Sequence, residues 1–272
     1  MSVTAGDELE VAVGQLTADT DVEANTATAV RAIEYAKGAE LVVLPEYTSG
    51  WAKELTADLA VAPDSEFNRA VAAAAARTGS TVVLGTMEPQ SGPGQRAQNI
   101  ALALGPGGQE VGRYRKVHLF DAYGIRESDA LAPGEPGGRN VLVFDAGPLR
   151  IGVATCYDLR FPESFRTLVD AGAQVLVLGA AWASGEGKAD LLRTLARARA
   201  IENTCYVLVA SQYGPGRSGH SLIIDPSGVV LAEADGESPA ILGATLSRQV
   251  LERARARVPS LEHRRFRVVA DS

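Results

Sequence analysis

The chain has 272 residues, of which 46% are hydrophobic and 22% are charged, and its formal net charge is -7. This length and apolar content suffice for one large core, so we expect a single domain over residues 1–272. An acidic chain without a lysine-rich patch argues against binding to nucleic acids or to anionic membranes.

The sequence contains no segment that points to a membrane or to secretion. No apolar run is long enough to span a bilayer, and the N-terminal residues lack the basic and apolar parts of a signal peptide. Two cysteines, Cys156 and Cys205, cannot form a disulfide framework. The histidines His118, His220 and His263 lie too far apart for metal-ligand spacing. We therefore expect a cytoplasmic protein with free thiols and no metal site.

Strands and helices alternate along the chain, which indicates a layered α/β architecture. Strands are expected over residues 9–16, 40–46 and 80–87, twice within 99–117, twice within 140–156, and over 173–181, 204–212, 219–228, 229–234 and 240–247. Helices are expected over residues 21–39 (closing on Gly38), 64–79, 162–172, 187–203 and 248–258. The strands are almost continuously apolar, which is typical of sheets covered on both faces.

One long loop and two clusters of basic residues can also be predicted from the sequence. Residues 118–139 are rich in glycine and proline, and we expect a long loop there, of the kind that often carries functional residues. Basic residues cluster in 253–257 and in 263–267. We interpret the first cluster as a solvated helix face and the second as an ion-paired tail, with a nucleic-acid-binding arm as the weaker alternative.

Three apolar strands end in a reactive side chain: a carboxylate at Glu46, an amine at Lys116 and a thiol at Cys156. Ligands of α/β folds bind beyond the carboxyl ends of strands, so these groups could converge on one site. We expect the charge of Lys116 to favour the thiolate and to stabilise an oxyanion together with the backbone N–H of Tyr157. Glu46 would take the thiol proton and pass it to a leaving amine.

Each of these residues also has a plainer interpretation. A lone cysteine on an apolar strand is usually a small core residue, and Cys205 fits that description because no charged residue flanks it. Glu46 could cap a turn, and Lys116 could pair with a surface acid. Lysine is scarce, however, since the chain has only four, and Lys116 stands beside an apolar stretch.

The segments "LVVLPEY", "RYRKVHLFD" and "ATCYDLRFPE" resemble the signatures of the nitrilase, or carbon–nitrogen hydrolase, superfamily. The resemblance is closest to the branch of omega-amidases and deaminated-glutathione amidases. It implies a four-layer αββα sandwich in a single domain that forms a homodimer or higher homo-oligomer, with no cofactor. It also implies that Glu46 is the general base, Lys116 the oxyanion stabiliser and Cys156 the nucleophile. Glu127, in "ESDALAPGE", would be a supporting acid that positions the lysine or the substrate.

Further residues near the signatures are candidates for substrate binding. Tyr157, Tyr47 and Trp182 flank the three signature blocks, as do Phe120, Tyr123 and Tyr213. Arg160 suits a substrate carboxylate, although an internal ion pair with Asp158 or Glu163 is the favoured interpretation.

The function that follows is an amidase that hydrolyses a small aliphatic amide through a cysteine thioester and releases ammonia and a carboxylic acid. Nitrile hydrolysis and N-carbamoyl hydrolysis use the same three residues and remain alternatives. A hydrolase or acyltransferase that pairs Cys156 with His118 or His220 is a second class. A binding or scaffold protein without turnover is a third, against which the intact set of reactive residues argues.

Overall fold

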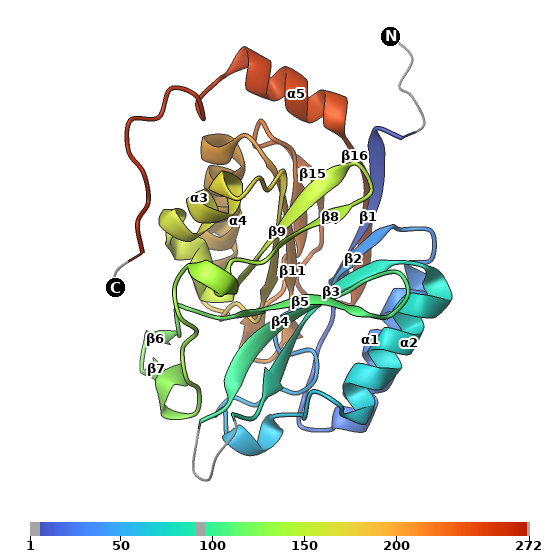
Figure 1. Ribbon diagram of the computed structural model, residues 1–272. Helices are drawn as coiled ribbons and strands as arrows, with labels where there is room; N and C mark the ends of the chain where they lie inside the picture. The colour runs from blue at the N-terminus through green and yellow to red at the C-terminus, as the bar shows by residue number, and fades with distance from the viewer. Residues whose placement is uncertain (1–5, 91–95, 271–272) are drawn as a thin grey trace.

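Two six-stranded β-sheets lie face to face in the computed structural model of the chain, which describes residues 6–90 and 96–270 (Figure 1). The first five residues of the N-terminal segment discussed above lie outside these ranges. Helices cover the outer face of each sheet, so the layers follow the order helix, sheet, sheet, helix. This is the architecture that the sequence predicted.

The first sheet has the strand order β16-β1-β2-β3-β4-β5. Strands β1, β2 and β3 are parallel neighbours, and the remaining pairs are antiparallel. Strand β5 therefore runs in the same direction as β2, and both end at the same edge. The strands are β1 (Glu8–Gln15), β2 (Leu41–Val43), β3 (Thr81–Glu88), β4 (Gln98–Leu104), β5 (Glu110–Arg115) and β16 (Ala240–Ser247).

The second sheet has the strand order β15-β14-β11-β10-β9-β8. Strands β9, β10 and β11 are parallel, and the outer pairs are antiparallel. The strands are β8 (Val143–Ala146), β9 (Leu149–Thr155), β10 (Val175–Ala180), β11 (Tyr206–Ser211), β14 (Leu222–Ile224) and β15 (Val230–Glu233).

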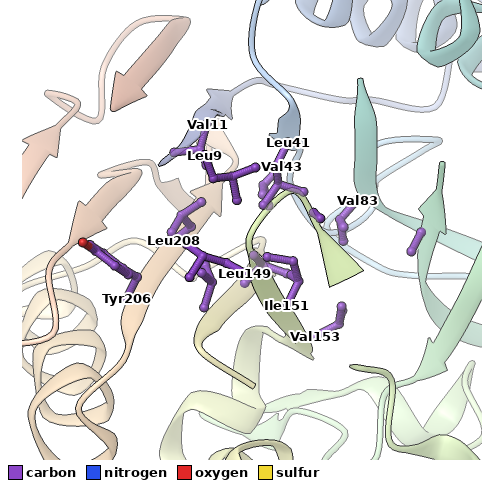
Figure 2. Close-up of a cluster of buried hydrophobic side chains, with 14 of the residues drawn as sticks. Leu9, Val11, Leu41, Val43, Val83, Leu149, Ile151, Val153, Tyr206 and Leu208 are labelled. Atoms are coloured by element: carbon purple, nitrogen blue, oxygen red, sulfur yellow. The ribbon is translucent and has the colours of Figure 1, made fainter. Parts of the chain in front are cut away.

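The apolar core between the sheets explains why they pack together. Leu9 and Val11 of one sheet and Ile151 and Leu208 of the other point into it (Figure 2). Ala12, the residue after Val11, faces the opposite way and belongs to the cluster beneath the helices, as the period of two in a strand requires. Each large side chain buried in this way contributes about 1.5–3 kcal/mol, so the continuous apolar strands hold the sandwich together.

The helices begin and end at residues that satisfy their free backbone groups. Asp21 accepts a hydrogen bond from the N–H of Ala24 at the start of α1, and Ser65 accepts one from Asn68 at the start of α2. Gly79 ends α2 in the left-handed conformation. The helices are α1 (Val22–Tyr35), α2 (Glu66–Thr78), α3 (Pro162–Asp170), α4 (Lys188–Asn203) and α5 (Arg248–Arg257).

Several of the expected elements are shorter than predicted; the strand expected over 219–228, for example, covers only Leu222–Ile224. The helix expected over 21–39 ends at Tyr35, and Gly38 lies in the following turn with a φ of 106°. The strand expected over 40–46 ends at Val43 because the proline at position 45 has no N–H to continue the ladder. Glu46 therefore lies beyond the strand, in a turn that contains Tyr47 with a φ of 57°.

Two short hairpins were not predicted, because strands of two residues leave no periodic pattern. One joins β6 (Asp121–Ala122) to β7 (Ile125–Arg126) inside the expected loop 118–139. The other joins β12 (Tyr213–Gly214) to β13 (Arg217–Ser218).

The C-terminal tail runs beside α3 (Figure 1), where Arg264 forms an ion pair with Asp170. Within the described ranges, none of the helices combines the length and the apolar character that a membrane span requires.

Two strand glycines make room for the backbone of Glu46 between the sheets. A Cβ atom on Gly85 of β3 would lie 2.4 Å from the Cα of Glu46, and one on Gly179 of β10 would lie 2.8 Å from its backbone nitrogen. Both contacts are with backbone, which cannot swing aside as a side chain can. Because Gly85 and Gly179 have no side chain, the backbone of Glu46 can lie between the two strands.

We predict that Gly85→Ala lowers the free energy of unfolding by about 1–3 kcal/mol, because the added methyl group overlaps the chain at Glu46. Gly243→Ala on β16 is the matched control, since a Cβ there meets nothing closer than 3.9 Å. Urea unfolding of both variants checks this, and equal midpoints would contradict the close approach.

Candidate active site

A pocket of about 570 Å³ lies beyond the carboxyl ends of strands from both sheets. Glu46 follows β2, Cys156 follows β9 and Ala181 follows β10, and all three line the pocket. Lys116, the residue after β5, lies behind the pocket wall and is only 1% exposed. The structure thus brings together the three strand ends that the sequence singled out.

The Lys116 ammonium is shared between two carboxylates. Its Nζ lies 2.9 Å from Oε1 of Glu46, and 2.9 and 2.8 Å from the two oxygens of Glu127. Burial by itself lowers the pKa of Lys116, but attraction to Glu127 and Glu46 outweighs it and raises the pKa well above its usual value. Lys116 is therefore charged at neutral pH.

The Glu46 carboxylate is held by further donors. Asn99 Nδ2 donates to Oε1 at 2.7 Å, and the N–H of Ala181 donates to Oε2 at 2.8 Å. Gln212 Nε2 donates to the backbone oxygen of Glu46 at 2.7 Å. Asn99, Ala181 and Gln212 were not predicted, because none of them belongs to a motif with a recognisable chemistry.

Glu127 is held in the same way on the other side of the lysine. The Tyr47 hydroxyl donates to Oε1 at 2.7 Å, and the N–H of Phe120 donates to Oε2 at 2.7 Å. Burial and the neighbouring carboxylates Glu127 and Glu46 raise the pKa of Tyr47 well above its usual value. Tyr47 therefore remains a hydrogen-bond donor to Glu127 and does not ionise.

Cys156 begins a short 3-10 turn (Cys156–Arg160) with a φ of 44°, a left-handed conformation that non-glycine residues rarely adopt. Burial raises the pKa of its thiol well above the usual value, and the charge of Glu46 raises it further. Lys116 acts in the opposite direction, but it is already shared by two carboxylates. Lys116 thus favours the thiolate, as expected, but burial and the charge of Glu46 outweigh its effect on the pKa of Cys156.

Aromatic rings surround Arg160 at the pocket wall. Its guanidinium lies 6.0 Å from the ring centre of Tyr157 and 5.6 Å from that of Trp182. The expected ion pair with Asp158 or Glu163 does not form in the described part of the chain. Asp158 is taken instead by other donors, which leaves Arg160 without a carboxylate partner there.

The candidate site residues predicted from the sequence differ in whether they line the pocket. Eight of them line the pocket: Glu46, Tyr47, Phe120, Glu127, Cys156, Tyr157, Arg160 and Trp182. Tyr123 lines a neighbouring shallow groove, and Tyr213 lies in the β12–β13 hairpin and lines neither.

The histidines and the second cysteine lie away from the pocket lining. His118 Nδ1 lies 2.7 Å from Asp158 Oδ1, and His220 lies beside Glu233. Cys205 is buried in the helix-facing core, as expected. It does have a charged neighbour, because Arg255 of α5 reaches to 3.3 Å from its sulfur. In the described ranges, His, Cys, Asp and Glu side chains form no cluster of three or more suited to a metal ion.

Comparison with known proteins shows the family. The sequence pattern named carbon-nitrogen hydrolase matches residues 10–256. The chain belongs to this family. Its fold is the αββα sandwich of the nitrilase superfamily, and it is an enzyme of the class that acts on carbon–nitrogen bonds, as the sequence signatures predicted.

Relatives of known identity cover nearly the whole chain. The deaminated glutathione amidase of Synechocystis sp. (strain PCC 6803 / GT-S) is 36% identical, over 93% of this chain and 96% of the relative. XC1258 from Xanthomonas campestris, a CN-hydrolase superfamily protein with an arsenic adduct in the active site, has a TM-score of 0.86 at 27% identity, over 97% of this chain and 99% of that one. A mutant amidase from Nesterenkonia sp. AN1, with the acetamide moiety of fluoroacetamide added covalently at its active site cysteine, has a TM-score of 0.75 at 27% identity, covering 97% and 98%.

We predict that Cys156 reacts with methyl methanethiosulfonate at a rate that still rises with pH at about pH 9, where an ordinary thiol begins to level off. A raised pKa leaves the thiol protonated at neutral pH, so the reactive thiolate fraction grows tenfold for each pH unit below that pKa. Mass spectrometry of a Cys205→Ser variant measures the rate at Cys156 alone, with N-acetylcysteine as the control. A plateau near pH 7 would instead indicate a preformed thiolate–ammonium pair.

Proposed function

We propose that the protein is an amidase that hydrolyses a small aliphatic amide through a thioester on Cys156, with Glu46 and Lys116 as its catalytic partners. The observation that carries this proposal is the shared position of the three groups: Lys116 Nζ lies 2.9 Å from Glu46, and both Glu46 and Cys156 line one pocket. No cofactor takes part in the reaction.

The first step forms the carbon–sulfur bond. Glu46 accepts the proton of the Cys156 thiol as the sulfur attacks the amide carbon. The carbonyl oxygen becomes an oxyanion, which the Lys116 ammonium and the backbone N–H of Tyr157 stabilise. The charge of Lys116 is always available for this step, because two carboxylates keep it protonated.

The second half releases both products. Glu46 returns the proton to the leaving nitrogen, the carbon–nitrogen bond breaks, and ammonia departs from the thioester. A water molecule that gives its proton to Glu46 then attacks the thioester carbon. The carbon–sulfur bond breaks, the sulfur recovers a proton, and the sum is one amide and one water converted to one acid and one ammonia.

Glu127 supports this chemistry without exchanging protons. It binds Lys116 with both of its oxygens and is itself fixed by Tyr47 and by the N–H of Phe120. Its role is to hold the ammonium at the position where the oxyanion develops.

Arg160 gives the proposal its substrate preference. A guanidinium at the pocket wall without an acidic partner in the described residues suits a carboxylate on the substrate. The relatives named deaminated glutathione amidase support an amide as the substrate. We therefore favour a short amide that carries a carboxylate at its far end.

Two alternatives share the pocket. A nitrile or an N-carbamoyl group presents the same electrophilic carbon bonded to nitrogen, and the same three residues could act on either. A Cys–His mechanism is less well supported, because His118 and His220 contact acids outside the pocket lining.

We expect Cys156→Ala to lower kcat by about 10³-fold or more and Lys116→Met by about 100-fold or more, because the nucleophile and its partners act as one unit. His220→Gln is the control and should retain activity within about twofold, since His220 takes no part in the mechanism. Ammonia release from a panel of amides measures all three, and mass spectrometry detects the acyl adduct on Cys156. Full activity of Lys116→Met would favour the Cys–His scheme instead.

A separate prediction concerns substrate choice. Arg160→Leu should raise KM about tenfold or more for amides with a terminal carboxylate, which lose a charge-assisted hydrogen bond, and leave neutral amides unchanged. Arg126→Leu is the control, because Arg126 already pairs with Asp129 at 3.3 Å. An equal effect of Arg160→Leu on both kinds of amide would show that Arg160 only supports the wall.

A further inference from the structure

A fully buried carboxylate outside the reacting group, that of Asp158, connects the segments that carry Lys116 and Cys156. Its side chain is 0% exposed. Oδ2 accepts hydrogen bonds from the Tyr114 hydroxyl at 2.7 Å and from the N–H of Thr155 at 2.9 Å. Oδ1 lies 2.7 Å from His118 Nδ1 and 3.4 Å from the backbone nitrogen of His118. One carboxylate thus ties two distant parts of the sequence together.

The contacts on the lysine side come from both sides of Lys116 along the chain. Tyr114 lies in β5, two residues before the lysine, and His118 lies two residues after it, beyond the end of the strand at Arg115. Both bind Asp158. Burial and the charge of Asp158 raise the pKa of Tyr114 well above its usual value, so its hydroxyl stays protonated and donates. The Asp158 carboxylate therefore holds the chain on both sides of Lys116.

The contacts on the cysteine side restrain a strained turn. Asp158 accepts from Thr155, the residue before Cys156, and its own backbone oxygen accepts from the N–H of Phe161 at 2.8 Å. Between these bonds, Cys156 keeps its unfavourable φ of 44°. Strain of this kind persists only where the surroundings over-determine the backbone. The His118 ring closes the arrangement by stacking on Phe161, with ring centres 3.7 Å apart.

We propose that Asp158 is a positioning residue that sets the distance between the Lys116 ammonium and the Cys156 sulfur. The inference rests on the proposed function, in which these two groups act on the same carbonyl. When the carboxylate is lost, the turn relaxes, and the sulfur moves away from Glu46 and towards the pocket solvent. A displacement of about 1 Å at a reacting atom is enough to cost a large part of the rate.

Asparagine does not replace this carboxylate. The groups that bind the Asp158 carboxylate are donors: the Tyr114 hydroxyl, the Thr155 N–H, the backbone N–H of His118, and the ring Nδ1 of His118 in the tautomer with its proton on Nδ1. An amide offers one oxygen and one NH₂ group, so one donor of the protein would meet another donor. Asp158→Asn therefore removes the connection on one side while nearly preserving the volume.

We expect Asp158→Asn to lower kcat for the best amide substrate by about tenfold to 100-fold, with KM changed less than about threefold, because binding groups stay in place while the reacting groups separate. The second readout needs no turnover. The pH profile of the methyl methanethiosulfonate reaction should show the pKa of Cys156 falling towards its ordinary value, because the sulfur is no longer held beside Glu46. Unchanged kcat and an unchanged thiol profile in the folded variant would overturn the proposal.

Matched tyrosine variants separate positioning from stability. Tyr114→Phe removes one donor to Asp158, and Tyr206→Phe removes a buried hydroxyl that binds the Ser247 backbone at 3.1 Å, away from the pocket. We expect both to lower Tm, but only Tyr114→Phe to lower kcat, by about threefold or more, and to shift the thiol profile. Equal effects of the two variants on kcat would contradict the inference.

The outcomes remain distinct if one part fails. If Asp158→Asn does not fold, the comparison of Tyr114→Phe with Tyr206→Phe decides the matter. If the wild-type protein releases no ammonia from any amide, the proposed function fails, and the thiol profiles still test whether Asp158 positions Cys156.

Discussion

The buried ammonium of Lys116, shared between Glu46 and Glu127, is the interaction on which the site depends. A charge with 1% exposure is tolerated only when it is paired and hydrogen-bonded. Here one positive charge meets two negative ones, so the excess negative charge must be met by other donors. Asn99, the N–H of Ala181, Tyr47 and the N–H of Phe120 supply them. The cost of burying this group is offset by contacts among six other residues, which makes its geometry rigid.

The sandwich provides this arrangement because both sheets end their parallel strands at the same place. Glu46 follows β2 and Lys116 follows β5 in one sheet, while Cys156 and Ala181 follow strands of the other. The backbone of Glu46 must also fit between β3 and β10, which the bare backbones of Gly85 and Gly179 permit. The apolar core and the reactive centre are therefore two regions of one interface. The apolar side chains fix the separation of the sheets over most of the interface. The reactive groups occupy the end of the interface where Gly85 and Gly179 leave room for Glu46.

The sequence predicted that Glu46, Lys116 and Cys156 lie together because each follows an apolar strand, and strand ends converge in α/β folds. It did not predict Asn99 or Gln212, since a hydrogen-bond partner is decided by how two sheets pack and not by local pattern. It predicted the direction in which Lys116 acts on the thiol, but not that burial and Glu46 together raise the pKa of Cys156, because both depend on how the sheets pack. It misjudged Arg160 for a related reason: Asp158, the nearest acid in sequence, is occupied by residues from β5 and the segment after it.

A neutral resting thiol has a consequence for selectivity. A thiolate held beside an imidazolium is reactive towards any electrophile that reaches it. In the proposed mechanism the sulfur gains its negative charge only as Glu46 removes the proton, and the charge then passes to the carbonyl oxygen beside Lys116. The nucleophile is therefore activated by a substrate that places an oxygen at the ammonium, and much less by an electrophile that lacks one. Under this proposal, burial and the two carboxylates that raise the pKa of Cys156 protect the thiol between turnovers, and the single ammonium restores its reactivity in the transition state.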